Sequence, residues 1–323
     1  MLRTFTCLAI LSFGLIVSNA TADTFTRTHD FILGTNLKLI IVTDSDTTAD
    51  KVETAVLSEI ERLNLILSTY DPDSEVSALN TANSARISSD LFEVLQACEA
   101  IRDETKNALS CRIGALLKAW QAGEEAGEAP SRAALRLVAG EIRRAKLNLD
   151  QNTLSLERPD VVTFQLNALA KGYIIDRALA AARTTSPDLD GLLINIGGDI
   201  KTWGQSPDES QWVAAIKPAR SESGVGVEIE LGDGALATSG RGPRDREIDG
   251  KTYSHIVSPK SGWHVQGVSQ ASVIAGDAVT ADALATALLV MPLNDGLLLI
   301  ETRDGVEARI VADDGRAYPT SGW

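Results

Sequence analysis

Segments with helical periodicity and segments with strand character alternate along most of this chain, and that alternation limits the fold more than any other feature. Residues 49–67 place hydrophobic side chains at spacings of three and four, which is typical of an amphipathic helix. Residues 31–43 contain two runs rich in β-branched residues with a Gly-Thr turn between them, which predicts two strands. We therefore expect an α/β (α+β) fold with mixed sheets and packed helices, as a single domain or as two intertwined lobes.

The remaining hydrophobic runs continue this alternation to the end of the chain. Further helices are expected at residues 89–105, after Ser131, from 167–173 to 183, and at 281–290. Strands are expected at residues 191–200, where a Gly-Gly turn ends the run, and at 212–217, 225–231, 268–274 and 306–311. The polar residues 123–130 are expected to form a surface loop, and residues 238–243 a turn.

The composition is that of an ordinary globular protein with an acidic balance. The 323 residues have a formal net charge of −14, a sequence pI near 4.7 and a mean hydropathy of +0.00. A general nucleic-acid-binding protein would present a basic face, and electrostatic docking on an anionic membrane also requires one. The composition therefore argues against both as bulk partners, while the length is sufficient for a large hydrophobic core.

The N-terminus has the three parts of a cleavable signal peptide. Arg3 supplies a short positive region, residues 7–17 form an apolar run, and Ala20-Thr21-Ala22 is a small-residue cleavage signal. The apolar run is too short to cross a bilayer comfortably, and no other uncharged run approaches about 18 residues. We expect residues 1–22 to be removed on export and residues 23–323 to form one mature domain with no stable membrane span. A buried N-terminal helix is the alternative.

Two cysteines remain once Cys7 is removed with the signal peptide. Cys98 and Cys111 lie thirteen residues apart in a mostly helical pattern, so a disulfide and two buried free thiols are both compatible with the sequence. Neither belongs to a Cys-x-x-Cys or Cys/His cluster, which disfavours zinc binding and thioredoxin chemistry.

A lysine stands at the predicted start of a helix in the sequence Ala168-Leu169-Ala170-Lys171-Gly172. The free N–H groups and positive dipole of a helix N-terminus, with a lysine beside them, suit a phosphate group. A surface lysine is the alternative interpretation. The spacing of a P-loop is absent.

An acidic and a hydroxyl side chain lie four residues apart in the strongly apolar run 280–288. Asp282 and Thr286 therefore share one face of the expected helix, in a setting where an unpaired carboxylate is costly. Carboxylate and hydroxyl oxygens suit Mg²⁺, with phosphate oxygens and water completing the shell. Alternatively, Asp282 caps the helix and the Thr286 hydroxyl bonds to its own helix backbone.

Two further places carry candidate chemistry. Residues 196–199 end a buried strand in a Gly-Gly pair that suits either close approach to a ligand or a tight turn, and they lack the Gly-x-Gly-x-x-Gly pattern of a dinucleotide fold. His255 is expected in a strand that ends at Pro259, as a base, a ligand contact or a structural histidine. With three histidines in the chain, a His-rich metal site is disfavoured.

Taken in order, seven stretches of this sequence resemble the periplasmic FAD:protein FMN transferases, the ApbE-type flavin transferases. The stretches are residues 33–35, 67–70 with 73–80, 170–173 with 176–178, 195–199, 238–240, 254–256 and 281–287. Each is weak alone, but together they span nearly the whole mature chain in the order of the family.

The resemblance implies a specific reaction. Members bind FAD with Mg²⁺ at its pyrophosphate, and a Thr or Ser hydroxyl of an exported target protein attacks the FMN phosphorus. AMP leaves, and the target, an electron-transfer protein, carries FMN through a phosphoester. This is phosphoryl-type transfer, in which charge neutralisation and positioning supply most of the catalysis.

The resemblance also assigns roles to residues of this chain. It implies that Asp282 and Thr286 bind the metal together with the backbone carbonyl of Ala168, and that His255 assists the transfer, so that His255 and Asp282 are the catalytic pair. The positions implied to contact FAD are Leu33, Tyr70, Ala108, Leu109, Ser110, Gln165, Lys171 and Val257.

Four positions depart from the family pattern. Ser110 and Gln165 stand where relatives often have Asp, Ser258 replaces an Asp after the His-Ile pair, and Ala285 stands where some relatives add a carboxylate to the metal shell. We expect the metal affinity to depend more strongly on the FAD phosphates as a result. Transfer remains the favoured hypothesis, with an FAD pyrophosphatase or a non-catalytic periplasmic FAD-binding protein as alternatives.

Overall fold

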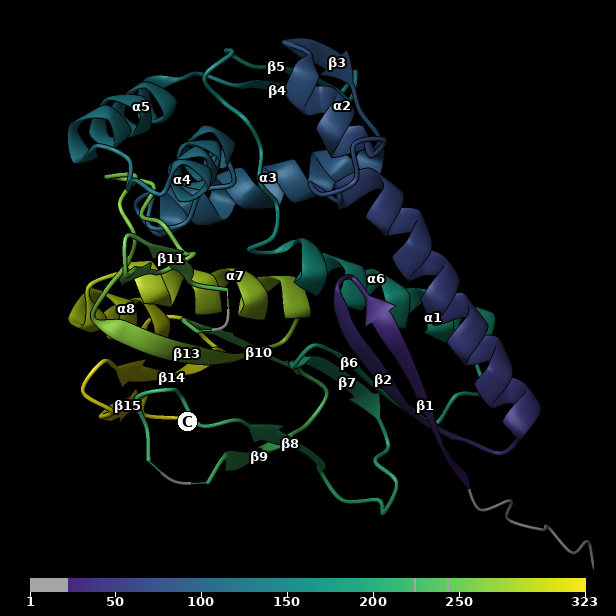
Figure 1. Cartoon of the computed structure of the whole chain (residues 1–323). Coiled ribbons are helices and arrows are strands. Elements are labelled where there is room, and N and C mark those ends of the chain that lie inside the picture. Colours follow the sequence, from purple (N-terminus) through teal and green to yellow (C-terminus); the bar gives the residue numbers. More distant parts are fainter. Residues whose placement is uncertain (1–22, 224, 243) are drawn as a thin grey trace, which may run out of the picture.

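The computed structural model describes residues 23–223, 225–242 and 244–323, and its centre is an antiparallel sheet of eight strands (Figure 1). The predicted signal peptide lies outside the described residues. In sheet order the strands are β1 (Asp23–Ile32), β2 (Thr35–Thr43), β6 (Gly191–Ile196), β7 (Asp199–Gly204), β10 (Ala235–Gly240), β13 (Val268–Ala275), β14 (Glu307–Ala312) and β15 (Ala317–Pro319). Among the described residues, no helix is both long and apolar enough to cross a membrane.

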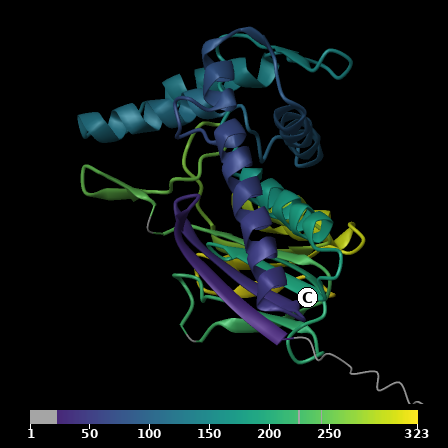
Figure 2. The same ribbon diagram turned by 90° about the vertical axis from the view of Figure 1, so that its right-hand side faces the viewer.

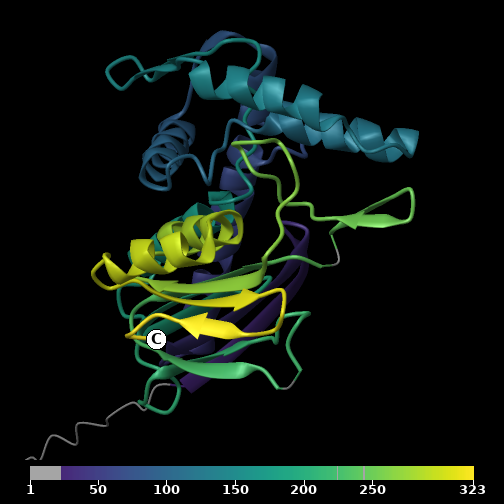
Figure 3. The same cartoon turned by 90° about the vertical axis from the view of Figure 1, so that its left-hand side faces the viewer.

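Four helices cover one face of this sheet. They are α1 (Asp46–Leu67), α6 (Ala170–Thr185), α7 (Ala278–Val290) and α8 (Leu293–Glu301), and Figures 2 and 3 show their layer from two sides. The Ser45 side chain caps α1 by accepting a hydrogen bond from the Thr48 N–H, and the predicted hydrophobic face of α1 is buried. The other sheet face packs on the hairpin of β8 (Trp212–Ile216) and β9 (Val227–Leu231). We call the sheet, these four helices and this hairpin the sheet lobe.

A second group of helices stands beyond α1 and α6, and we call residues 68–169 the helical lobe (Figure 1). It contains α2 (Glu75–Thr81), α3 (Ser89–Glu104), α4 (Gly114–Ala126), α5 (Arg132–Arg144) and a small sheet of β3 (Ser84–Arg86), β5 (Ser155–Glu157) and β4 (Asn148–Asp150). The chain leaves the sheet lobe after α1 and returns to it at α6. A continuous buried cluster crosses between the lobes, so the two form one unit.

A segment of the sheet lobe also reaches back to the helical lobe. Residues 241–267 leave β10, form the projecting hairpin of β11 (Arg246–Ile248) and β12 (Lys251–Tyr253), and return to β13 (Figures 2 and 3). The Trp120 indole N–H of α4 donates to the Gly262 carbonyl at 2.8 Å, and Trp263 lies beneath the Arg132 guanidinium. Because this segment contacts the helical lobe before it returns to the sheet, the two lobes interlock. This matches the predicted alternative of two intertwined lobes.

The structure corrects several local predictions. Helix α4 continues to Ala126, so the loop expected from residue 123 begins only at Gly127, whose φ of 70° ends the helix. Its Ala and Glu residues are good helix formers despite their polar appearance. Residues 238–240 belong to β10, because they pair with β13. His255 lies outside any strand, in a segment held by one bridge between Val257 and His264.

Candidate active site

A cavity of about 880 Å³ lies where the helical lobe meets the sheet lobe. Its walls come from α4, α6, α7 and β10 and from the segments around residues 70, 110, 165 and 257. The candidate residues that line it are Tyr70, Ala108, Leu109, Ser110, Gln165, Ala168, Lys171, His255, Val257, Asp282 and Thr286. Leu33 is outside this lining; it lies in the β1–β2 turn with a φ of 49° and packs against the main core.

One corner of the cavity contains a buried carboxylate among oxygen donors. Asp282 on α7 is 5% exposed, and its Oδ2 accepts a hydrogen bond from the Gly172 N–H at 3.1 Å. One turn later, the Thr286 hydroxyl lies 3.0 Å from the Ser239 hydroxyl of β10. Asp277, rather than Asp282, caps α7, which removes the capping interpretation of Asp282. Asp282 and Thr286 therefore both line the cavity from α7, on the shared helix face that their four-residue spacing predicts.

Burial, reinforced by the negative charge of Asp199, raises the pKa of Asp282 to about 7. The charge of Lys171 and the hydrogen bond from Gly172 oppose this rise. A cation beside Asp282 would relieve the cost of its buried charge, and the donors around it are all oxygens. Within the described part of the chain, no three His, Cys, Asp or Glu side chains cluster as a metal site, so a metal at this corner would have one carboxylate and the neighbouring hydroxyls as side-chain ligands. This set fits Mg²⁺ and disfavours zinc.

The close crossing of α6 and α7 builds this corner. A Cβ on Gly172 would lie 2.2 Å from the Ala278 carbonyl oxygen, so only glycine permits the approach. The carboxylate of Asp176 accepts hydrogen bonds from the Ala278 and Val279 N–H groups at 3.0 and 2.9 Å. These contacts bring the first turns of two helices together, with Asp282 facing the α6 backbone.

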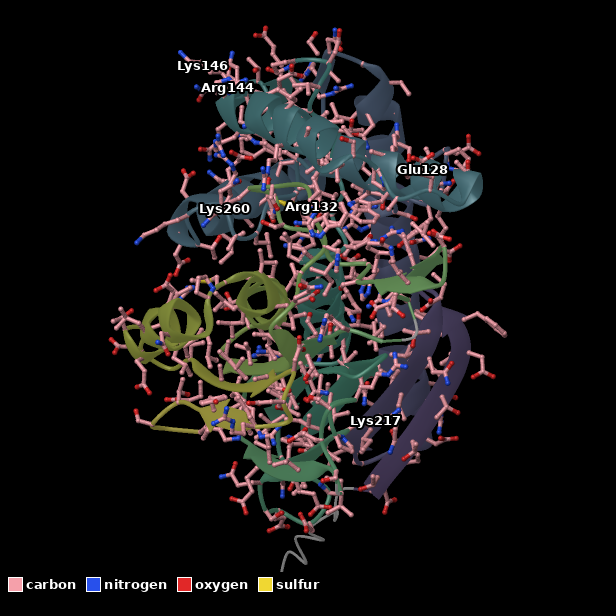
Figure 4. All side chains as sticks on the ribbon, turned by 60° about the vertical axis from the view of Figure 1, so that its left-hand side comes forward. Glu128, Arg132, Arg144, Lys146, Lys217 and Lys260 are labelled. Atoms are coloured by element: carbon pink, nitrogen blue, oxygen red, sulfur yellow. A yellow bond between two sulfur atoms is a disulfide. The ribbon has the colours of Figure 1, made fainter. Side chains whose placement is uncertain are left out.

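Lys171 extends the polar corner toward the open cavity. Its ammonium lies 2.7 Å from Asp199 Oδ2, at the start of β7. Burial disfavours the charged form, but Asp199 and Asp282 outweigh it and raise the pKa of Lys171. The side chain is a partly buried ammonium paired with Asp199, which removes the surface-lysine interpretation. Basic residues elsewhere, such as Arg144 and Lys146, lie at the far end of the helical lobe and outside the lining (Figure 4).

His255 lines the same cavity, in the segment after β12. Its Nδ1 is 2.9 Å from Asp245 Oδ1, and the same oxygen accepts the His255 backbone N–H at 3.1 Å. Burial lowers the pKa of His255, although the charge of Asp245 opposes the change. Burial would raise the pKa of Asp245, but the two hydrogen bonds from His255 outweigh it and lower that pKa. The imidazole is therefore neutral near pH 7.

On the helical-lobe side, the lining residues 108–110 and Gln165 are uncharged, and a disulfide supports their segments. Cys98 and Cys111 form a disulfide with Cα atoms 5.8 Å apart, which decides between the two alternatives left by the sequence. The Cys111 carbonyl accepts the Gln165 N–H at 2.7 Å, so two lining segments are joined side by side. Nearby, Tyr70 is 77% exposed, and its hydroxyl accepts a hydrogen bond from Asn167 Nδ2 at 2.7 Å.

Two of the departures from the family pattern have a structural account. Ser258 Oγ accepts the N–H of Lys260, two residues later, so it supports the turn as an aspartate would. Ala285 is completely buried and does not line the cavity. Ser110 and Gln165 do line it, as uncharged polar side chains.

The model of the ApbE family matches residues 33–310. The chain belongs to the ApbE family. It is 31% identical over 281 residues to a Vibrio cholerae protein named FAD:protein FMN transferase, an alignment that covers 84% of this chain and 83% of the relative. A Haemophilus influenzae protein of the same name is 29% identical, with 85% and 81% covered.

Solved structures of the ApbE family share the fold. The ApbE protein of Thermotoga maritima superimposes with a TM-score of 0.83 at 27% identity, covering 93% of this chain and 98% of that one. The flavin transferase ApbE of Vibrio cholerae gives a TM-score of 0.77 at 27% identity, with the same coverage. The mixed α/β prediction is confirmed across the chain.

Sequence reasoning missed several groups of this ApbE-family site. Ser239 and Asp199 lie in stretches that carry the resemblance, but nothing in their spacing indicated partners on α7 and α6. Arg244 lines the cavity without an ion pair to any described residue, and Asp245 holds His255. The polar run 241–247 resembles an ordinary surface turn, so no sequence signal distinguished these side chains.

Proposed function

We propose that this chain is a Mg²⁺-dependent FAD:protein FMN transferase that acts in the periplasm after export. It would transfer FMN from FAD to a Thr or Ser hydroxyl of an exported electron-transfer protein, with release of AMP. The observation that carries the proposal is the buried oxygen corner of Asp282 and Thr286, which shares one cavity with Lys171. Membership of the ApbE family and the names of the relatives support it.

The donor chemistry supports Mg²⁺ as the cofactor. The Asp282 carboxylate, the Thr286 hydroxyl and the Ala168 carbonyl would hold the ion, and FAD phosphates and water would complete its shell. When bound, Mg²⁺ would neutralise charge on the pyrophosphate and on the attacked phosphoryl group. Because this chain supplies one carboxylate, metal and FAD are expected to bind cooperatively.

The protein residues bind and orient the substrate. Lys171 would face the pyrophosphate as a fixed positive charge, kept ionised by Asp199. The exposed Tyr70 ring can stack on the flavin or the adenine. The neutral wall of Ala108, Leu109, Ser110, Gln165 and Val257 would bury the ring systems. Leu33 stays a prediction of the resemblance, outside the cavity lining.

The direct test is to incubate the purified protein with FAD, MgCl₂ and candidate acceptor proteins. We expect flavin fluorescence that stays on the denatured acceptor, AMP in equal amount, and loss of both with EDTA. AMP and free FMN without an acceptor would instead identify a pyrophosphatase. Stoichiometric FAD binding without AMP under any metal would identify a non-catalytic flavin-binding protein.

A further inference from the structure

The segment between β10 and β11 places an acidic residue, Asp245, in contact with His255, which lines the cavity. The carboxylate of Asp245 is nearly buried, and a single oxygen of it accepts both the ring Nδ1 and the backbone N–H of His255. The Asp245 N–H in turn donates to the Gly242 carbonyl at 2.8 Å, which closes a tight turn. One carboxylate oxygen therefore holds both the ring and the backbone of His255.

This contact determines which nitrogen carries the proton. An ionised carboxylate only accepts hydrogen bonds, so Nδ1 must be protonated and Nε2 must carry the lone pair. Within residues 23–223, 225–242 and 244–323, Nε2 has no hydrogen-bond partner, and His255 lines the cavity with Lys171 and Asp282. The basic nitrogen is thus the one left for the cavity.

We propose that Asp245 is a positioning residue that holds His255 as the Nδ1–H tautomer, so that Nε2 accepts the proton of the acceptor hydroxyl. This inference rests on the proposed function. The hydroxyl oxygen forms a bond to the FMN phosphorus, the bond between that phosphorus and the bridging oxygen breaks, and AMP leaves with the electron pair. The proton moves to Nε2 and then to solvent, and the Asp245 carboxylate stabilises the imidazolium meanwhile.

Positive groups near His255 disfavour the imidazolium form, so the Asp245 carboxylate is needed to stabilise it. The guanidinium groups of Arg244 and Arg246 lie near the ring and disfavour its protonation, as burial does. Lys171, on α6, adds another positive charge to the same cavity, and Asp282, on α7, a negative one. Asp245 is the anion in direct contact with the imidazole.

The variant Asp245→Asn tests the role, because Asn keeps the shape and an acceptor oxygen but removes the charge. We expect kcat to fall roughly 10- to 100-fold, with the KM for FAD unchanged and the acidic limb of the pH profile displaced to lower pH. Asp249→Asn, on the exposed tip of the same hairpin, is the matched control and should behave as the wild type.

A double-variant comparison separates this role from general support of the fold. In a His255→Ala background, Asp245→Asn should cause no further loss, because the group it acts through is gone. An additional loss comparable to that in the wild-type background would overturn the proposal, and so would an unchanged pH profile. If the wild type itself transfers no FMN, the proposed function fails instead.

A measurement without turnover completes the test. The chain has three histidines, so ¹H–¹⁵N spectra of the imidazole rings can be assigned by variants. We expect His255 in the free protein to be the Nδ1–H tautomer, with a pKa that falls in Asp245→Asn. An Nε2–H tautomer for His255 would contradict the proposal even if Asp245→Asn proves unstable and even if no acceptor is known.

Discussion

The sheet-lobe wall and the helical-lobe wall of the cavity differ in chemistry and in what holds them in place. The first carries Lys171, Asp199 and Asp282 on or directly beside regular elements, fixed by a helix crossing that needs glycine at position 172. The second carries the uncharged residues 108–110 and Gln165 on irregular segments joined to the Cys98–Cys111 disulfide, and helix α4 adds Lys118 and Glu124. The proposed metal and phosphate groups thus lie on or beside regular elements, whereas the proposed ring contacts and the His255–Asp245 pair lie on irregular segments.

Two consecutive residues directly before the helical-lobe wall illustrate how such a segment is held. Lys106 and Asn107 both have positive φ, at 50° and 61°, directly before the lining residues 108–110. The Asn107 N–H donates to the Arg102 carbonyl at 2.6 Å, and Asn107 Oδ1 accepts from Arg102 Nε at 3.2 Å. Uncommon backbone conformations persist only when their surroundings over-determine them, and this one adjoins the proposed substrate.

The largest effect on turnover is expected from the charged wall. Asp282→Asn should lower FMN transfer and AMP release at least about 100-fold, because the single carboxylate of the metal site is lost. Asp277→Asn, which changes the capping carboxylate of the same helix to another good cap, should stay near wild type. Metal-dependent AMP release measures both, and undiminished release from Asp282→Asn would contradict the metal assignment.

Gly172→Ala should have the next largest effect. The new Cβ would overlap the Ala278 carbonyl, so α6 and α7 must separate, at a cost of about 2–3 kcal/mol in the free energy of unfolding, with weaker Mg²⁺ binding. The control is Gly140→Ala in α5, where a Cβ meets only the flexible Arg144 side chain, at 3.3 Å. That variant should be as stable as the wild type or slightly more stable in urea titrations. Equal stability of the two variants would show that the crossing tolerates a side chain.

Removal of the disulfide should affect substrate binding more than chemistry. In Cys98→Ala/Cys111→Ala, the segment 108–110 loses its support, and we expect the KM for FAD to rise several-fold with kcat little changed. The free energy of unfolding should fall by about 2–3 kcal/mol, as for other disulfides that close short loops. Steady-state kinetics with varied FAD separate the two parameters. A drop in kcat alone would mean that the neutral wall also positions the reacting atoms.

The smallest expected effect concerns stability: the free energy of unfolding of the metal-free protein should depend on pH through Asp282. The metal-bound enzyme should not show this dependence. The pKa of Asp282 rises from an ordinary 3.8 to about 7 in the fold. Its contribution to stability is therefore fully present below pH 3.8 and is lost as pH rises to about 7. In urea unfolding with EDTA, the free energy of unfolding of Asp282→Asn should rise relative to that of the wild type between pH 4 and 7. Above pH 7 the difference should stay constant. A constant difference throughout would mean that the carboxylate is not destabilised by burial.

Local patterns predicted the parts of the site that lie on one element. The four-residue spacing of Asp282 and Thr286 was sufficient to place both oxygens on one helix face, because helix geometry alone determines it. The same reasoning predicted the position of Lys171 near the start of α6. It did not predict α4, and it assigned the last turn of this helix, from residue 123, to a loop, since an Ala/Glu run with flanking glycines is compatible with a helix and with a loop.

The sequence by itself determined the mixed fold, the family resemblance and the residue types that the chemistry needs, because periodicity and short motifs are local properties. Only the tertiary structure decided that Gly172 hydrogen-bonds a carboxylate 110 residues away, that Cys98 pairs with Cys111, and that Asp245 holds His255. These contacts depend on how elements pack, and packing is the sum of many weak interactions distributed along the whole chain. No single stretch of sequence is therefore sufficient to predict these contacts.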